Sequence, residues 1–215
     1  MTSIPSHDDD AALDPRLAAQ ILGDGGRIGD RLSPDPRILF GVWGIAWFVG
    51  FGALWTTART ATDVQPAGWA FAVFYALLAT AVVVTIVHVT RRSRGLRGTS
   101  ATTGSMYGWS WLVAFTVVGL VLGALGRADT DPAVMGIVST ALPCLVVGTL
   151  YMAGAATYRD WSWFALGAWI AVMAGIGAMT GMPSIYLVMS VAGGGGLLVG
   201  AFACHVAGRR GRGRP

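Results

Sequence analysis

Two histidines lie at matching positions in two apolar segments and could act as axial ligands of a haem. His88 lies three residues before Arg91, and His205 lies four residues before Arg209. Paired histidines at one level of two helices are what axial haem ligation requires. The sequence offers no further ligand, and a histidine near a membrane interface can equally reach lipid headgroups or bond a neighbouring helix. We therefore expect no cofactor.

Other groups with potential chemistry are sparse. His7 precedes Asp8–Asp10. This set could bind a metal weakly, but a solvated terminus of such composition is typical of disorder. The chain has no lysine and hence no phosphate-binding loop of the kind that ends in one. Cys144 and Cys204 fall inside apolar segments, where free cysteine behaves as a small hydrophobe. We expect neither a metal site nor a disulfide framework.

Ionisable side chains are missing from the interior of the apolar segments. All 15 basic residues are arginine, all 11 acidic residues are aspartate, and they lie at segment ends or in connecting stretches. Ion-coupled transporters and proton pumps carry such groups at membrane depth, where their cost is tolerated only for function. Coupling to protons or sodium through a buried carboxylate is therefore disfavoured. An intramembrane hydrolase is disfavoured for the same reason, and we expect a protein that is not an enzyme.

Helix-breaking residues occur in the middle of two apolar segments. Pro143 lacks the amide N–H that a helix uses, and Gly193–Gly196 are four consecutive glycines. Interrupted segments at corresponding positions of repeated halves indicate a transport site. The predicted solute pathway is lined by Pro143, Ser139, Thr140, Gly193, Gly194, Gly195 and Gly196. The alternative interpretation is a tightly packed or lipid-facing irregularity.

These residues belong to six long apolar blocks. Hydrophobic residues make up 54% of the chain and charged residues 12%. A block of about 18 to 25 residues, at about 1.5 Å per residue, can cross the ~30 Å hydrocarbon core. The fold class we predict is therefore all-α, a polytopic membrane protein with six transmembrane helices. The blocks are approximately Ile38–Thr56, Ala67–Thr90, Tyr107–Leu125, Ala133–Thr157, Trp161–Thr180 and Ser184–Ala207.

The arginines are distributed unevenly between the two sides of the predicted bundle. With six crossings, Arg59 and Arg127 fall on one side and all the others on the side of the termini. Because positive residues are enriched on the cytoplasmic side, we place both termini in the cytoplasm. The predicted organisation is a cytoplasmic arm over residues 1–37, a membrane domain over 38–207 and a basic tail over 208–215. Within the arm, LDPRLAAQILGDGG predicts a short amphipathic helix.

The positive net charge of +4 favours lipid over nucleic acid, because the arginines flank apolar blocks. Membrane lipids are the expected partners. The sequence leaves open whether the protein forms a homodimer or binds an unknown membrane or cytoplasmic partner. The predicted interface anchors are Trp109, Trp111, Trp161, Trp163, Arg91, Arg92, Arg94 and Arg97.

A Trp-Ser-Trp triplet stands at the head of the third and the fifth blocks. Tryptophan is enriched at the membrane–water interface, so anchoring is one explanation. An internal repeat is the other, because Tyr107 and Tyr158 are separated by the same number of residues as Pro132 and Pro183. In that case, blocks three–four and blocks five–six are two copies of one helical hairpin.

The segment RGLRGTSATTGSMYGWSW, from Arg94 to Trp111, resembles a group of small six-helix membrane proteins of high-GC bacteria that are often labelled transporters. The resemblance covers less than a tenth of the chain and carries no assignable substrate residues. It implies a protein of the bacterial cytoplasmic membrane. The predicted function is a small-solute transporter or the membrane subunit of one. The alternative is a non-transporting scaffold or regulator that binds a cytoplasmic partner or anionic lipid.

The arginine distribution predicts which positions can be labelled in intact cells. Cysteines introduced at Ser6, Ser100 or Pro215 should resist a membrane-impermeant thiol reagent added outside, because these positions face the cytoplasm. Cysteines introduced at Ala61 or Thr130 should react. Labelling of a cysteine at Ser100 from outside the cell would contradict the predicted membrane topology.

Overall fold

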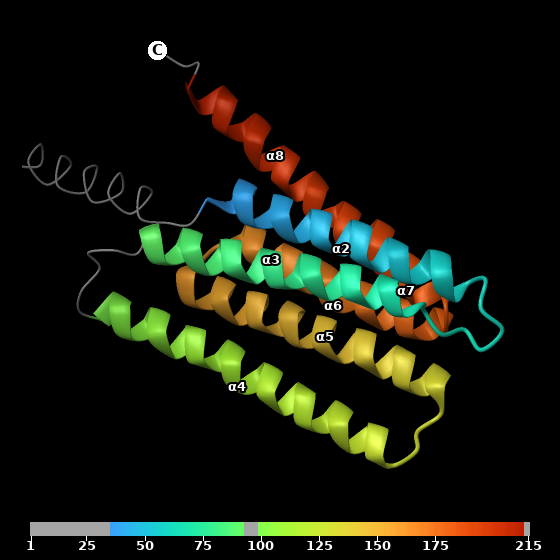
Figure 1. Ribbon diagram of the computed structural model, residues 1–215. Helices are drawn as coiled ribbons and strands as arrows, with labels where there is room; N and C mark the ends of the chain where they lie inside the picture. The colour runs from blue at the N-terminus through green and yellow to red at the C-terminus, as the bar shows by residue number, and fades with distance from the viewer. Residues whose placement is uncertain (1–34, 93–98, 213–215) are drawn as a thin grey trace, which may run out of the picture.

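The computed structural model describes residues 35–92 and 99–212. Arg94, Arg97, the His7 group and the predicted amphipathic helix of the arm lie outside these residues. Six helices of the described ranges are long and apolar enough to cross a membrane, which confirms the predicted fold class. The elements in Figure 1 are α2 (Pro36–Ala58), α3 (Gly68–Arg92), α4 (Thr99–Arg127), α5 (Pro132–Tyr158), α6 (Trp161–Thr180), α7 (Ser184–Val188), the π-helix η1 (Met189–Gly194) and α8 (Gly195–Arg212).

The helix bounds follow the predicted blocks most closely at the fifth, where α6 covers the same residues. The third helix departs furthest, because α4 begins at Thr99 rather than at Tyr107. The last helix also continues beyond the predicted Ala207, to Arg212. Apolar blocks mark the part of a helix that suits hydrocarbon, whereas helical hydrogen bonding continues into polar flanks.

Aspartates begin helices α2, α5 and α6. The Asp35 side chain accepts a hydrogen bond from the Arg37 amide at 3.0 Å, and Pro36 fills the first turn. Asp131 and Asp160 cap α5 and α6 in the same way, each 2.8 Å from the amide two residues on. A carboxylate there satisfies an amide without an intrahelical partner and complements the positive end of the helix dipole.

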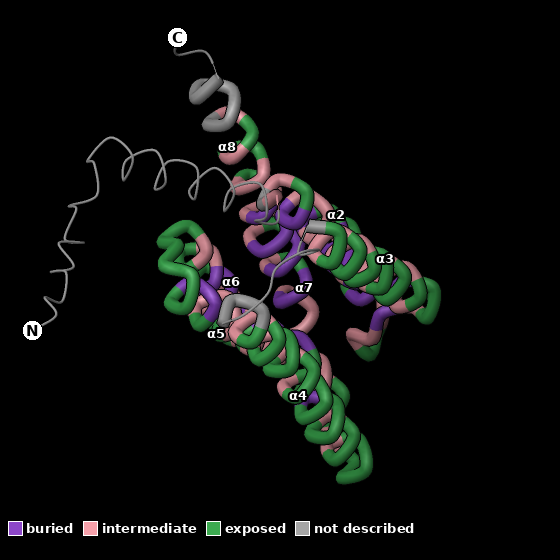
Figure 2. Tube along the Cα trace, turned by 90° about the vertical axis from the view of Figure 1, so that its left-hand side faces the viewer, coloured by how far each residue is buried: buried purple, intermediate pink, exposed green. Residues whose placement is uncertain are grey.

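The spanning helices form two units that α7 and η1 join (Figures 1 and 2). In the α2 unit, α2 packs against α3 and α8, and in the α5 unit, α5 packs against α4 and α6. Of the described helices, α3 packs closely on α2 alone and α4 on α5 alone. Both α7 and η1 contact α2 on one side and α6 on the other. The sixth span is therefore the connection between the units.

The two ends of the bundle differ in what they hold. The terminal end holds the starts of α2, α4 and α6 together with the ends of α3, α5 and α8, whereas the loop end holds the α2–α3 and α4–α5 connections (Figure 1). Arg91 and Arg159 lie at the terminal end, and Arg59 and Arg127 lie at the loop end. This agrees with an even number of crossings, while the cytoplasmic orientation of the terminal end stays a prediction.

Helix α2 supplies the largest share of the buried core. Phe51 contacts Phe74 of α3, with ring centroids 4.8 Å apart, and Tyr186 of α7, with centroids 6.4 Å apart. This one ring therefore links three elements. The buried apolar residues of α2 are Leu39, Phe40, Ala46, Trp47, Phe51, Leu54 and Ala58.

Close backbone contact holds α5 against α6. A Cβ atom added at Gly148 would lie 2.6 Å from the carbonyl oxygen of Gly167, and one at Gly167 would lie 2.6 Å from that of Gly148. Small residues let membrane helices approach until dispersion forces act along the backbones. Gly167 and Ala171, small residues four apart on α6, both lie against Gly148. Gly175, on the same helix, has no such neighbour within 4 Å.

In each Trp-Ser-Trp triplet, one tryptophan is exposed and the other packs against the protein. The first tryptophans, Trp109 and Trp161, are 60% and 82% exposed, as expected of interface anchors. The second tryptophans, Trp111 and Trp163, both pack on Tyr151 of α5, with ring centroids 5.8 and 5.6 Å apart. The second tryptophan of each triplet therefore joins helices, so anchoring alone does not account for the motif.

The α5–α6 contact predicts a position-specific loss of stability. Gly148→Ala should lower the free energy of unfolding by about 1–3 kcal/mol, because the new methyl group must push the two backbones apart. Gly175→Ala, which adds the same methyl group into open space on α6, is the matched control. Thermal unfolding of the purified protein in detergent measures both. Equal midpoints for Gly148→Ala and wild type would contradict the close contact.

Candidate functional site

The sixth span changes its helical form close to the middle of its length. Helix α7 ends at Val188, η1 follows as a π-helix, and α8 begins at Gly195. The Gly195 amide donates to the carbonyl of Ser190, five residues back, which is π-helical bonding. Glycine lowers helix stability by up to about 1 kcal/mol per residue relative to alanine, and four occur in succession here. The predicted interruption is confirmed, in the form of a π-helix.

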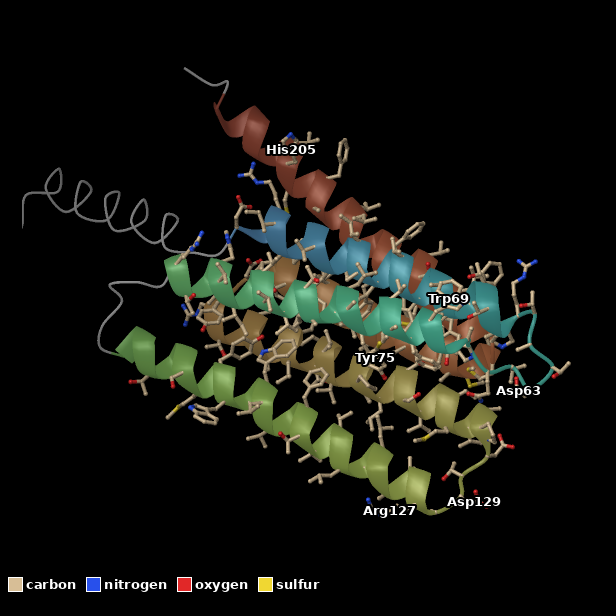
Figure 3. The ribbon with its side chains drawn as sticks, viewed as in Figure 1. Asp63, Trp69, Tyr75, Arg127, Asp129 and His205 are labelled. Carbon is tan, nitrogen blue, oxygen red and sulfur yellow. The ribbon has the colours of Figure 1, made fainter. Side chains whose placement is uncertain are left out.

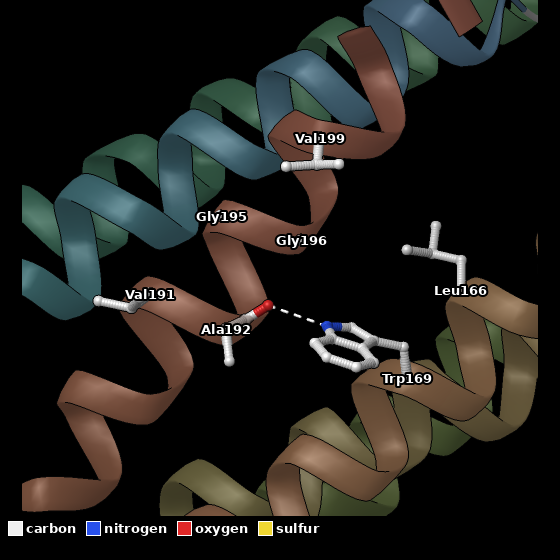
Figure 4. A pocket seen from close by; sticks show the side chains of 7 residues that line it. All are labelled: Leu166, Trp169, Val191, Ala192, Gly195, Gly196 and Val199. Atoms are coloured by element: carbon white, nitrogen blue, oxygen red, sulfur yellow. Dashed lines mark hydrogen bonds between the residues drawn. The ribbon is translucent and has the colours of Figure 1, made fainter. Parts of the chain in front are cut away.

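Two side chains from different helices meet this interruption. The Ser190 hydroxyl donates to the carbonyl oxygen of Phe48, in α2, at 2.7 Å. The Trp169 indole N–H, in α6, donates to the carbonyl oxygen of Ala192 at 2.9 Å (Figure 4). Ser190 itself is only 4% exposed. One hydrogen bond therefore ties η1 to each unit.

Three glycines of the run pack closely against α2 and α6. A Cβ atom at Gly193 would lie 3.1 Å from the Trp47 ring, and one at Gly194 would collide with the Phe48 backbone. A Cβ atom at Gly196 would lie 2.6 Å from the Trp169 indole nitrogen. The glycine run therefore packs on α2 and α6.

Beside the interruption lies an apolar groove between α6 and the sixth span. Its volume is about 520 Å³. The Trp169 indole N–H beside it already donates to Ala192, so the groove has no free donor from that side chain. Figure 4 shows its lining residues: Leu166, Trp169, Val191, Ala192, Gly195, Gly196 and Val199. This surface suits hydrocarbon and offers little to a polar molecule.

A second hollow, which we name the loop-end hollow, has a different character. It is an open depression with a volume of about 330 Å³, lined by residues of both units at the loop end. Its polar side chains are an amide and three hydroxyls, with aromatic, proline and methionine surfaces between them. The lining residues are Gln65, Phe71, Thr130, Pro132, Met135, Gly136, Ser139 and Tyr186. This composition fits a small polar ligand.

The structure divides the predicted pathway residues among separate places. Ser139 lines the loop-end hollow, and Thr140, the next residue, is buried. Gly195 and Gly196 line the apolar groove.

Pro143 departs from the prediction, because α5 runs unbroken through it and α5 is not among the helices that pack closely on η1 or α8. Neither of the two hollows described contains both Pro143 and a residue of the glycine run. Helix α6 contributes the side chain that lies beside the glycines, in place of the expected α5.

The histidines take structural or surface positions. The His88 Nε2 atom accepts a hydrogen bond from the Asp35 backbone amide at 2.9 Å, which fixes the entry of the chain into α2. His205 is exposed on α8 (Figure 3). Helices α3 and α8 both pack on α2 and do not pack closely on each other. Residues 35–92 and 99–212 contain no cluster of three or more side chains suited to a metal ion.

Sequence reasoning missed the residues that matter most at the interruption and the hollow. Ser190 and Trp169 are polar groups inside apolar blocks, and a search of the blocks for hydrogen-bonding side chains near the glycine run finds Ser190. Trp169 gives no comparable signal, because it is one of nine tryptophans and lies in a different block from the glycine run. Gln65 and Tyr186 come together only when the α2–α3 connection folds over α7.

Comparison of the chain with protein-family models, with curated proteins and with solved structures gives no match.

The bond from Trp169 predicts a local change in exchange. Trp169→Phe removes the N–H and keeps an aromatic ring, so the η1 backbone should open more often. Amide hydrogen exchange over residues 189–200 should become severalfold faster, as a lost hydrogen bond of about 1 kcal/mol implies. Trp161→Phe, at the exposed start of the same helix, is the matched control and should leave exchange there unchanged. The same protection in both variants would contradict the role of the indole.

Proposed function

We propose that this integral membrane protein is a small-solute transporter, or the membrane subunit of one. Transport would proceed by movement of the α2 and α5 units about the interrupted sixth span. The observation that carries the proposal is the π-helical interruption itself, tied to one unit through Phe48 and to the other through Trp169. Such π-helical segments occur frequently at functional sites, and interrupted spans are typical of transporters.

The depth of the interruption supports this role. Gly194 is the eleventh residue of the sixth span counted from Ser184 at the loop end. At about 1.5 Å per residue it lies ~15 Å deep, half of the ~30 Å hydrocarbon core. A change of helical form at that level moves one half of the span relative to the other, where solute has to cross.

The packing of the sixth span also supports it. Its loop-end half, α7 and η1, contacts both units, whereas the described part of α8 packs closely on α2 and η1. Apart from Gly196, which lies against Trp169 of α6, the half toward the terminal end packs mainly on α2. A pivot at the glycine run lets the α2 unit carry α8 away from α6 while α7 stays between the units.

The setting we propose is the bacterial cytoplasmic membrane, with both termini in the cytoplasm. The arginine distribution supports this orientation. Coupling through a buried carboxylate is not part of the proposal, because the spans carry no acidic residue in their interiors. A facilitative carrier, or a subunit driven by a separate protein, fits this composition. Assembly as a homodimer or with an unknown partner remains compatible with it.

A scaffold or regulator that binds anionic lipid or a cytoplasmic partner is the second candidate. The terminal end carries Arg91, with an exposed side chain, and Arg159, so it presents positive charge to headgroups. Anionic vesicles would bind in this case without any solute flux.

Transport should depend on the flexibility of the glycine run. In phosphatidylcholine proteoliposomes, stopped-flow light scattering should show faster swelling in ribitol or urea than protein-free vesicles show. Gly195→Ala should slow this swelling about fivefold, because alanine stabilises the helix by about 1 kcal/mol at a position open to a new methyl group. Gly175→Ala, equally open but in the unbroken α6, is the control. Swelling no faster than in protein-free vesicles would contradict transport, and equal slowing in both variants would contradict a pivot at Gly195.

A further inference from the structure

We infer that the loop-end hollow is a binding site for a small uncharged solute with several hydroxyl groups, of the short polyol class. The inference rests on the proposed function, since it names the substrate class for that transporter. Three observations support it. Neutral polar groups line the hollow, charged side chains are absent from its described lining, and the lining residues come from both units and from α7.

The hollow offers hydrogen-bonding capacity that the protein does not use itself. The Gln65 side-chain amide has no hydrogen-bond partner within the described parts of the chain, although its backbone amide donates to Asp63. The Ser139 hydroxyl donates to the Gly136 carbonyl at 3.2 Å, which leaves its oxygen able to accept. An unpaired amide and a hydroxyl on opposite walls can bind the hydroxyls of one solute together.

Thr130 adds an acceptor, because its hydroxyl donates to the Leu125 carbonyl at 2.7 Å and keeps its own lone pairs. Tyr186 is 3% exposed, so its side chain is held by packing and forms one wall of the hollow. Tyr186 and Phe71 add aromatic surface to the lining of the hollow. Polyols match such a lining, because they carry C–H faces between their hydroxyl groups.

Charged side chains are absent from the described lining of the hollow. Asp63 and Asp129 lie at the loop end (Figure 3), next in sequence to the hollow but not among its lining residues. Asp63 accepts a hydrogen bond from the Gln65 backbone amide, and Asp131 caps α5. The Arg59 guanidinium lies over the Trp55 ring, 4.7 Å from its centroid. An ion in the hollow would lose hydration without a counter-charge in the lining itself, which favours an uncharged solute.

The size of the hollow sets the size of the solute. At ≈ 30 Å³ per water, a volume of about 330 Å³ equals that of about eleven water molecules, enough for roughly ten non-hydrogen atoms. A five-carbon polyol such as ribitol is of this size.

The hollow also joins the parts that are proposed to move. Gln65 and Phe71 come from the α2 unit, Ser139 comes from the α5 unit, and Tyr186 comes from α7. A solute bound to all three contacts the elements whose relative position changes in transport. Binding energy can then act on the same segment that continues into η1.

Calorimetric titration of the full chain in phosphatidylcholine nanodiscs tests the site, because this lipid carries no headgroup hydroxyls. Ribitol should bind saturably with a Kd of about 1 mM or tighter, and acetate and tetramethylammonium should not bind. Gln65→Leu should weaken ribitol binding about tenfold, and Ser139→Ala severalfold. Ser110→Ala, an exposed serine of α4 that also bonds its own helix, is the matched control. The thermal midpoints of all variants should equal that of wild type, which shows that each one folds.

Three results would overturn the site: binding of either ion, ribitol affinity unchanged in both Gln65→Leu and Ser139→Ala, or no saturable binding at about ten times the expected Kd. Flux of another solute in proteoliposomes would then leave the transport proposal standing. Ribitol binding without any flux would support the hollow as a site and remove the transport role.

Discussion

In hydrocarbon, no water is present to satisfy a backbone carbonyl or amide, and each one left alone costs several kcal/mol. A span that departs from α-helical bonding must therefore find partners within the protein. In the sixth span, the Ala192 carbonyl accepts from the Trp169 indole of α6 as well as from the Gly195 amide, and the Ser190 hydroxyl donates to the Phe48 carbonyl of α2. The interruption therefore lies where helices on both sides contact it, and the sixth span runs between the two units.

The same requirement explains why the two units are built differently. The α2 unit must provide a flat backbone surface for the glycines, and Gly194 meets the Phe48 backbone directly. The α5 unit is held together by its own glycine contact, Gly148 against Gly167, and by the ring of Tyr151 between two tryptophans. Each unit is therefore held together by packing contacts of its own. The proposed movement between them would therefore break contacts of α7 and η1 and leave the interior of each unit intact.

The sequence predicts the fold well because membrane spans are encoded locally, by length and apolar content. The positions of the helices, the Asp35 cap and an interruption at Gly193–Gly196 follow from such local signals. Which helices pack together depends on how well the shapes of their surfaces match. This cannot be read from local sequence, and α6 rather than α5 packs beside the glycine run. A proline in an apolar block is not enough to predict a break in the helix, since α5 continues through Pro143. Trp169 and Gln65 could not be chosen among similar residues, because their roles depend on neighbours distant in sequence.

The two hollows differ in chemistry, and this difference constrains the proposed mechanism. The loop-end hollow has neutral polar walls, whereas the groove in the middle of the membrane is apolar. Between them, Ile185, Tyr186 and Met189 are buried and fill the space with side chains. A polar solute in the hollow therefore meets an apolar barrier rather than a continuous wet path. A channel would need that path to be open, whereas a carrier forms it by moving one wall. The segment with the weakest helical bonding lies at this barrier, so the transport we propose is of the carrier type.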